Sequence, residues 1–327
     1  MHPEPSSRSA LLGAAAFGAV VVTIPAFAQD YPSKPVRIIV PYAPGGGLDV
    51  VGRPLAQKLA EAFGQPFLID NRPGGGTTIG TSAVARAAPD GHTLLLTLSA
   101  LAIGPSLYPS LPYDPVKDFA PVAWIGTSSY LLSVHPSVPA TTVKQLLALS
   151  RAAPGRLNYS SPGIGTDPHM AAELFQNLAG VRWTHIPYGG GGPAASAVMG
   201  GQVDLTFLPT SVGTPFVKSG KLKALALSTA RRSTLLPGLP TIAESGVDGF
   251  AAEAWSGILA PAGTPAPIVN RLNAAIVKVV QAADYRNLLE ERLIEPVGST
   301  VDQFAQRLRD DVAKWRRVAR EANIKPE

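Results

Sequence analysis

The sequence contains no cysteine among its 327 residues, so disulfides contribute nothing to its stability. The same absence argues against a lipid anchor attached through cysteine. Charged residues are few, at 16%, and the formal net charge is +5. The basic residues are dispersed and do not cluster with aromatic side chains, as nucleic-acid binding requires. We therefore expect a fold stabilised by packing, with no nucleic-acid partner.

Motifs of common enzymes are missing or incomplete. No serine has glycine two residues away on both sides, which argues against the nucleophile elbow of serine hydrolases. The segment Gly47–Gly52 has the spacing of a phosphate loop, but Arg53-Pro54 replaces the required lysine and hydroxyl. The histidines after the leader lie far apart without paired spacing, so we expect no metal and no cofactor; they are His92, His135, His169 and His185.

A dinucleotide-binding enzyme is the nearest enzymatic alternative. Gly45 and Gly47 follow an apolar run, and Asp70 lies where an acid would bind the ribose. However, Val50 occupies the position of the third glycine. An exported dinucleotide-dependent enzyme therefore stays the alternative, and the first expectation is that the protein is not an enzyme.

The first 28 residues have the pattern of a secretory signal peptide. Arg8 precedes an uncharged apolar run, which ends in the small-x-small sequence Ala26-Phe27-Ala28. An uncleaved membrane anchor is the competing interpretation, but Pro25 and the many small residues make the run weakly apolar. We predict cleavage after Ala28 and release into the periplasm.

The rest of the sequence alternates strand and helix patterns twice, which predicts α/β architecture. The first series runs from a strand at Val36–Val40 to about Tyr130, and the pattern then restarts. A return near Phe250 precedes two long predicted helices, near Ile268–Ala282 and Val301–Ala322. This order predicts two lobes joined by crossing strands, each a mostly parallel sheet flanked by helices. Lobe 1 comprises residues 29–130 and 251–327, and lobe 2 comprises residues 131–250.

Each half contains one glycine-rich loop between a strand and a helix: PYAPGGGLD in the first and SPGIGTDPH in the second. A helix start carries unpaired N–H groups, and glycine lets a ligand approach them. Two such loops facing one cleft would hold a small carboxylate between them. We expect Asp49 to cap its helix start and to shape the first loop, and His169 to orient the second loop.

The sequence resembles the substrate-binding receptors of bacterial tripartite tricarboxylate transporters, also called Bug proteins. The resemblance covers about Tyr31 to Ile324. PYAPGGGLD is similar to the family's aromatic-x-Pro-Gly-Gly-x-x-Asp loop, and SPGIGTDPHM to its Gly-x-Gly-Thr-x-x-His loop. NRPGGGTTIG, APDGHTLL, PTIAESG and WSGILAPAGTP also match.

The resemblance implies a type II periplasmic binding protein of the Venus-flytrap kind. It implies a monomeric receptor that holds a carboxylate through backbone amides and ordered water, then delivers it to integral-membrane permease subunits. Presenting the ligand to a membrane sensor is an alternative role. The implied ligand-binding residues are Tyr42, Ala43, Pro44, Gly45, Gly46, Gly47, Asp49, Ser99, Ser161, Gly163, Gly165, Thr166, His169, Tyr188, Gly189 and Asp204.

The sequence departs from the family pattern at two positions. Gly189 follows Pro187-Tyr188, where the family commonly has lysine. Gly104 replaces an asparagine that is usual in the loop after the third predicted strand. Both positions are expected near the part of the cleft that contacts the ligand's distal end.

Overall fold

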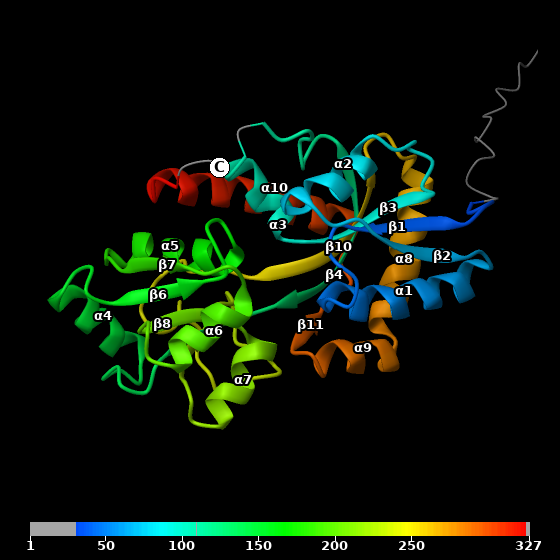
Figure 1. Cartoon of the computed structure of the whole chain (residues 1–327). Helices are drawn as coiled ribbons and strands as arrows, with labels where there is room; N and C mark the ends of the chain where they lie inside the picture. Colours follow the sequence, from blue (N-terminus) through cyan, green and yellow to red (C-terminus); the bar gives the residue numbers. More distant parts are fainter. Residues whose placement is uncertain (1–30, 109, 325–327) are drawn as a thin grey trace, which may run out of the picture. The chain divides into compact units, whose positions relative to one another are not determined.

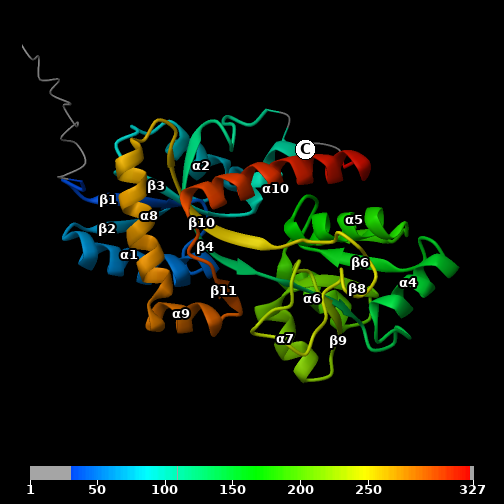
Figure 2. The same ribbon diagram turned by 180° about the vertical axis from the view of Figure 1, so that it is seen from behind.

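A computed structural model describes residues 31–108 and 110–324 (Figures 1 and 2). From Val36 onward, strands alternate with helices and assemble into two separate sheets. The predicted signal peptide, residues 1–28, lies outside the described residues. Over the described ranges, no helix combines the length and apolarity that crossing a bilayer requires.

The first sheet has six strands in the order β11-β4-β10-β3-β1-β2. Their bounds are β1 Val36–Val40, β2 Phe67–Asn71, β3 Thr93–Leu98, β4 Phe119–Ser128, β10 Ala254–Pro261 and β11 Ile294–Pro296. The helices of this half are α1 Gly47–Phe63, α2 Thr78–Ala85, α3 Ala100–Ile103, α8 Ala266–Gln281, α9 Ala283–Glu290 and α10 Val301–Glu321, with 3-10 turns η2 Gly75–Thr77 and η3 Gly104–Ser106.

The second sheet has five strands in the order β7-β6-β8-β5-β9. Its strands are β5 Tyr130–Val134, β6 Asn158–Ser161, β7 Thr184–Pro187, β8 Leu205–Pro209 and β9 Lys223–Leu227. Its helices are α4 Val143–Ala152, α5 Asp167–Ala179, α6 Gly191–Met199 and α7 Thr210–Lys218.

The two-lobed α/β fold is confirmed, but both sheets are mixed rather than mostly parallel. In the first sheet β1 runs parallel to β2 and β3, whereas β10 is antiparallel to β3 and β4. In the second, β6 is parallel to β7 and β8, whereas β5 is antiparallel to β8 and β9. The reason lies in the crossings: the chain leaves the first half along β4 and returns along β10, so these neighbours run in opposite directions.

Two crossing segments connect the halves (Figure 1), and their strands β4 and β10 pair with each other. Ser129 alone separates β4 from β5, and residues 250–253 lead back into β10. The Ser228 hydroxyl accepts the Tyr130 N–H (2.9 Å), and the Ala252 N–H donates to the Ser228 carbonyl (2.9 Å). These bonds hold the two crossings at one place, as a hinge between lobes requires. The proposed lobe boundaries stay a prediction.

Helix α1 shows how local sequence positions the first glycine loop. Leu48, Val51, Leu55 and Leu59 recur at three- and four-residue spacing and are all buried, so one face of the helix packs on the sheet. Gly64 ends the helix in the left-handed conformation (φ 69°) and donates its N–H to Ala60. The packing of this face on the sheet places the helix start beyond the carboxyl end of β1.

Helix α10 reaches both halves. It packs against β4 and α3 of the first half and against α5 of the second, and both views show it lying along the two halves (Figures 1 and 2). A capping box fixes its start, in which Thr300 accepts the Gln303 N–H and Gln303 accepts the Thr300 N–H. The predicted helix, Val301–Ala322, is one residue longer than the observed one.

Candidate ligand-binding cleft

The first glycine loop is shaped by a buried carboxylate. Asp49 is 6% exposed; its Oδ2 accepts the Gly45 N–H (2.6 Å), and its Oδ1 accepts the Asn71 amide (2.8 Å). Burial alone would raise the pKa of Asp49, but the hydrogen bonds from Asn71, Gly45 and Arg53 lower it below the ordinary value. Asp49 is therefore ionised and shapes the loop, as the sequence predicted. The predicted helix cap is wrong, because Asp49 accepts the N–H of Gly45, which precedes α1, and caps no N–H of the helix start.

The first backbone N–H groups of α1 are not bonded by a carboxylate or any other side chain of the described residues. The N–H groups of Gly46 and Gly47 make no hydrogen bond within the described residues. Two backbone donors at the positive end of a 17-residue helix are therefore available to an anion.

The second glycine loop uses its N–H groups internally. Gly165 donates to His169 Nδ1 (2.8 Å), and Gly163 donates to the Ser161 hydroxyl (3.2 Å). The Thr166 hydroxyl donates to the Gly163 carbonyl (2.8 Å). The predicted orienting role of His169 is confirmed, but the amides that the sequence assigned to a ligand are satisfied within the loop.

The second loop also touches the first half. Gly165 has φ +72°, and the space that a Cβ would need there is filled by the Leu107 side chain. Glycine is therefore required at Gly165 both for its backbone conformation and for this close approach. The loop closes one side of the space between the halves.

His169 belongs to a stack of rings in the second half. Its ring lies 4.1 Å from that of His185, and the His185 ring lies 4.7 Å from that of Tyr159. Burial lowers the pKa of His169 to about 3, with a contribution from His185, and burial lowers the pKa of His185 to about 4. His169 Nε2 lies 3.9 Å from Glu173, whose own pKa burial raises. Both imidazoles are neutral at pH 7.

Acid should destabilise the protein through these two rings. The pKa values of both rings in the native state lie below the ordinary 6.5. Below about pH 6.5 these histidines are therefore protonated in the unfolded chain but remain neutral in the native state, so the free energy of unfolding decreases as the pH falls. Between pH 7 and 5 we expect the wild type to lose about 1 kcal/mol more than a His185→Gln variant, because the partial exposure of the His185 ring weakens the effect. Urea unfolding at both pH values measures this difference. If both proteins lost the same unfolding free energy, the pKa of His185 would not be lowered in the native state.

A half-buried carboxyl group also lies between the halves. Asp167 begins α5, and its Oδ1 accepts the hydroxyl of Ser99, directly after β3 (2.6 Å). Burial raises the pKa of Asp167, although the Ser99 bond opposes the shift. Burial, and then the charge of Asp167, raise the pKa of the Tyr42 and Tyr130 hydroxyls. The Tyr42 hydroxyl makes no hydrogen bond to the described residues.

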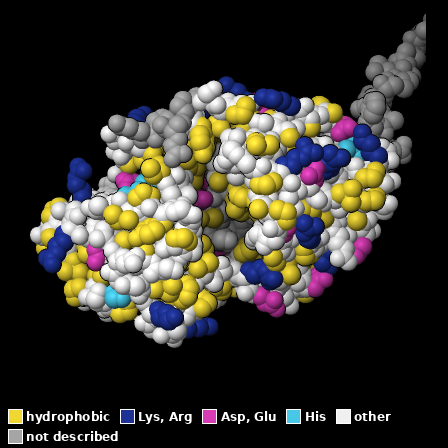
Figure 3. All heavy atoms as spheres, viewed as in Figure 1, with side chains coloured by type: hydrophobic (Ala, Val, Ile, Leu, Met, Phe, Trp, Pro, Cys, Tyr) yellow, Lys and Arg dark blue, Asp and Glu magenta, His cyan; other side chains and the backbone are white. Residues whose placement is uncertain are grey.

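A hollow lies between the halves (Figure 3), and two adjacent cavities occupy this region. The larger, which we call the apolar chamber, has a volume of about 770 Å³ and extends over α3, the second glycine loop, α6 and β8. The smaller, the polar chamber, has about 470 Å³ and lies at the start of α1, between the crossing strands and α7. The residues that line both chambers are Tyr42, Leu98, Tyr130, Pro209 and Val212.

The structure brings seven of the sixteen predicted site residues to these chambers. Tyr42, Ala43, Gly46, Gly47 and Asp49 line the polar chamber, and Tyr42, Gly165 and Thr166 line the apolar chamber. The residues that line neither are Pro44, Gly45, Ser99, Ser161, Gly163, His169, Tyr188, Gly189 and Asp204. Asp204 lies before β8, at the strand's amino end, where its Oδ2 accepts the Asn158 N–H (2.8 Å).

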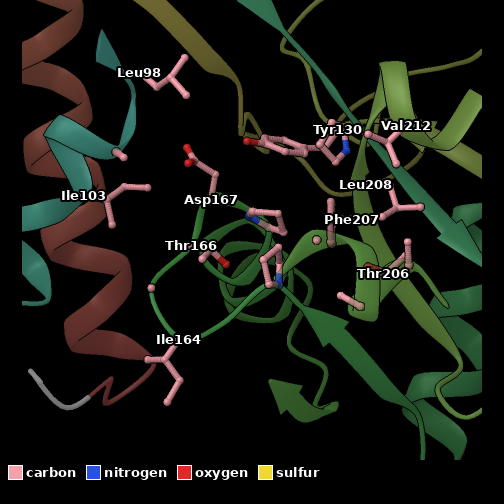
Figure 4. Close-up of a pocket in the computed structure, with 18 of the residues that line it drawn as sticks. Leu98, Ile103, Tyr130, Ile164, Thr166, Asp167, Thr206, Phe207, Leu208 and Val212 are labelled. Carbon is pink, nitrogen blue, oxygen red and sulfur yellow. The ribbon is translucent and has the colours of Figure 1, made fainter. Parts of the chain in front are cut away.

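Sequence reasoning did not select several lining residues. The polar chamber includes Ser256, on β10, and Arg292, before β11. The apolar chamber includes Tyr130 and Phe207, from β5 and β8 (Figure 4). These residues belong to crossing or central strands, where their apolar neighbours predict only core packing.

Comparison with known proteins identifies the family. A sequence profile described as "Tripartite tricarboxylate transporter family receptor" matches residues 51–324. The chain belongs to this receptor family. It is 37% identical to protein BugT of Bordetella pertussis over 308 residues, covering 93% of this chain and 94% of BugT.

Solved structures agree with the sequence relationship. R. palustris Rpa4515, solved with adipate, is 35% identical, with a TM-score of 0.76 over 91% of this chain and 100% of that one. MatC from Rhodopseudomonas palustris, with bound malate, is 33% identical, with a TM-score of 0.72 over 88% and 100%. The family consists of periplasmic solute-binding receptors, so the receptor is not an enzyme.

Proposed function

We propose that this receptor binds a small organic carboxylate in the cleft between its two halves and delivers it, as a monomer, to the permease subunits of a tripartite tricarboxylate transporter. Its family membership and the acids in the Rpa4515 and MatC structures support this function. Cleavage after Ala28 would release it into the periplasm.

The free start of α1 carries the proposal. Gly46 and Gly47 line the polar chamber with N–H groups that have no partner in the described residues. Asp49, the acid nearest in sequence, is already bonded by Gly45, Asn71 and Arg53, so its charge is largely compensated. A carboxylate placed at this helix start gains a favourable interaction of roughly 0.3–1 kcal/mol, or about 2 kcal/mol when partly buried.

The second glycine loop has a different part in the proposal. With Gly163 and Gly165 bonded inside the loop, it positions Thr166 and closes the cleft against Leu107. The two loops therefore act together, but the charge of the ligand is assigned to the first.

Binding should depend on the ligand's charge. Hexanoate should bind at least tenfold more tightly than hexanamide, because only the acid gains the charge-assisted bonds at the helix start, worth about 1.4 kcal/mol or more. Calorimetry on protein purified from the periplasm measures both affinities. The intact mass of the same purified protein should correspond to a chain that begins at Gln29. Equal binding of acid and amide would contradict carboxylate recognition.

A further inference from the structure

The apolar chamber has no basic side chain among the described residues that would pair with a second carboxylate. Its polar groups are hydroxyls, the Asp167 carboxyl and the amino end of α6 at Gly191 and Gly192. Its walls are formed mainly by aliphatic and aromatic side chains, including Leu98, Ile103, Ile164, Phe207, Leu208 and Val212 (Figure 4). No lysine or arginine is among the described residues that line it. Gly104, which also lines it, presents no side chain.

The apolar chamber contains an acidic side chain, whose charge has the same sign as that of a carboxylate ligand. Asp167 lines the chamber, and Figure 4 shows its carboxyl group and the Tyr130 hydroxyl directed toward the same part of the space. Asp167 already occupies the start of α5, where an incoming anion would otherwise be attracted. A second carboxylate in this chamber would lose its water and meet a like-charged or acidic neighbour without a cation.

The polar chamber differs from the apolar chamber in containing a basic side chain and a buried serine hydroxyl without a partner among the described residues. The Ser256 hydroxyl lines it, is 6% exposed at residue level, and makes no hydrogen bond to the described residues. An unpartnered buried hydroxyl is costly unless a ligand or water bonds to it. The Ser256 hydroxyl is therefore a donor available to an anion in this chamber.

Arg292 supplies a cation to the polar chamber. Its guanidinium donates to the Leu288 carbonyl (3.3 Å) and makes no ion pair among the described residues. Guanidinium groups bind carboxylates through paired N–H donors. With Gly46 and Gly47, the polar chamber thus combines two free amides, a free hydroxyl and an unpaired guanidinium. It also contains the Asp49 carboxylate, which already accepts hydrogen bonds from Gly45, Arg53 and Asn71.

We propose that the ligand is a monocarboxylic acid with an apolar body. Its carboxylate binds in the polar chamber, at Gly46, Gly47, Ser256 and Arg292, and its hydrocarbon body extends past Tyr42 into the apolar chamber. This inference rests on the proposed function and names the ligand class. It separates this receptor from Rpa4515 and MatC, whose structures hold the diacids adipate and malate.

Matched pairs of acids test the inference, because each pair differs by one carboxylate. Hexanoate is compared with adipate, and para-toluate with terephthalate, by calorimetry at neutral pH. We expect the monoacid of at least one pair to bind tenfold or more tightly than its diacid, a difference of about 1.4 kcal/mol. Diacids that bind as well as the monoacids would overturn the inference, as would the failure of both monoacids to bind at millimolar concentration.

Two variants assign the carboxylate to a chamber. Arg292→Gln should weaken hexanoate and adipate by the same factor, because both place one carboxylate in the polar chamber. Asp167→Asn should narrow the ratio between the two affinities, because it removes the acid that opposes adipate's second charge. An exposed control, Asp302→Asn at the start of α10, should leave the ratio unchanged. If Arg292→Gln weakened adipate alone, Arg292 would bind a second carboxylate and the inference would be wrong.

The affinities for hexanoate, adipate and hexanamide distinguish a failure of this inference from a failure of the proposed carboxylate-binding function. If adipate binds more tightly than hexanoate while hexanamide binds weakly, the receptor recognises carboxylates but belongs to the diacid class. If hexanamide binds as tightly as hexanoate, carboxylate recognition itself fails. A monoacid preference together with weak amide binding supports both proposals.

Discussion

Replacing Gly46 with valine should weaken carboxylate binding about 100-fold, or roughly 2.7 kcal/mol, while the protein keeps its fold. Gly46 has φ −77°, which valine also adopts. A Cβ there would meet only the Ala43 carbonyl oxygen at 3.5 Å, an ordinary contact. The added methyl groups would instead fill the polar chamber beside the free N–H groups. Calorimetry with hexanoate measures the loss, and thermal unfolding checks the fold.

Gly238→Val is the matched control for this experiment. Gly238 is exposed, lines neither chamber, and has no atom within 4 Å of the position of an added Cβ. It should bind hexanoate like the wild type. Should Gly46→Val bind normally as well, the first glycine loop would be a turn without a role in binding.

The sequence predicted the elements in which side-chain periodicity and end signals agree. Helix α10 is an example, because its buried residues Phe304, Leu308, Trp315 and Val318 recur at helical spacing and Thr300 caps its start. Helix α7 was missed. It contains Gly213 and Pro215, which disfavour helix, and only Thr210 and Gly213 in it are buried. Its helical form therefore depends on the neighbouring strands β5 and β8.

The same division applies to the cleft. The loop around Asp49 was predictable because its hydrogen bonds to Gly45 and Arg53 span only four residues. The free donors of the polar chamber were not, because Ser256 and Arg292 are more than 200 residues away along the chain from Gly46. Crossing strands bring them together, and single-sequence periodicity contains no information on that approach.

Local competition explains the difference at the second loop. Gly163 and Gly165 follow a strand and precede a helix, as an anion loop would. His169, four residues after Gly165, accepts its N–H, and Asp167 introduces a carboxyl group at the helix start. Which partner a glycine N–H selects depends on side-chain positions that the spacing of glycines does not determine.

The remaining large effect concerns the helix that joins the halves. Asp311 on α10 is 3% exposed. Its Oδ2 accepts the Trp255 indole N–H (2.9 Å) and Arg307 Nε (2.8 Å), and its Oδ1 lies 2.8 Å from Lys314 Nζ. Burial opposes ionisation, but Lys314 and Arg307 lower the pKa of Asp311 below its ordinary value. This one carboxylate therefore joins α10 to the crossing strand β10.

Asp311→Ala should cost about 3–5 kcal/mol of unfolding free energy, the usual cost of breaking a buried ion pair. The indole N–H of Trp255 and part of the Arg307 guanidinium would lose their buried acceptor, although Arg307 keeps Glu253 (3.0 Å). Urea unfolding measures the cost. Because the native pKa of Asp311 is lowered, its stabilising effect is lost as the pH falls below about 4, and the gap between variant and wild type should narrow there.

Asp310→Ala provides the neighbouring control, because Asp310 is exposed and, among the described residues, its carboxylate bonds only Gln306 (2.7 Å). Surface substitutions of this kind change stability by about 0.5 kcal/mol or less. If Asp311→Ala cost as little as this control, the hydrogen bonds of Asp311 would not secure α10. The helix would then be held to both halves by its apolar face alone, where Phe304 packs edge-on against Trp255 at 5.1 Å. A large cost for Asp311 together with a small one for Asp310 assigns the joint between β10 and α10 to this buried charge.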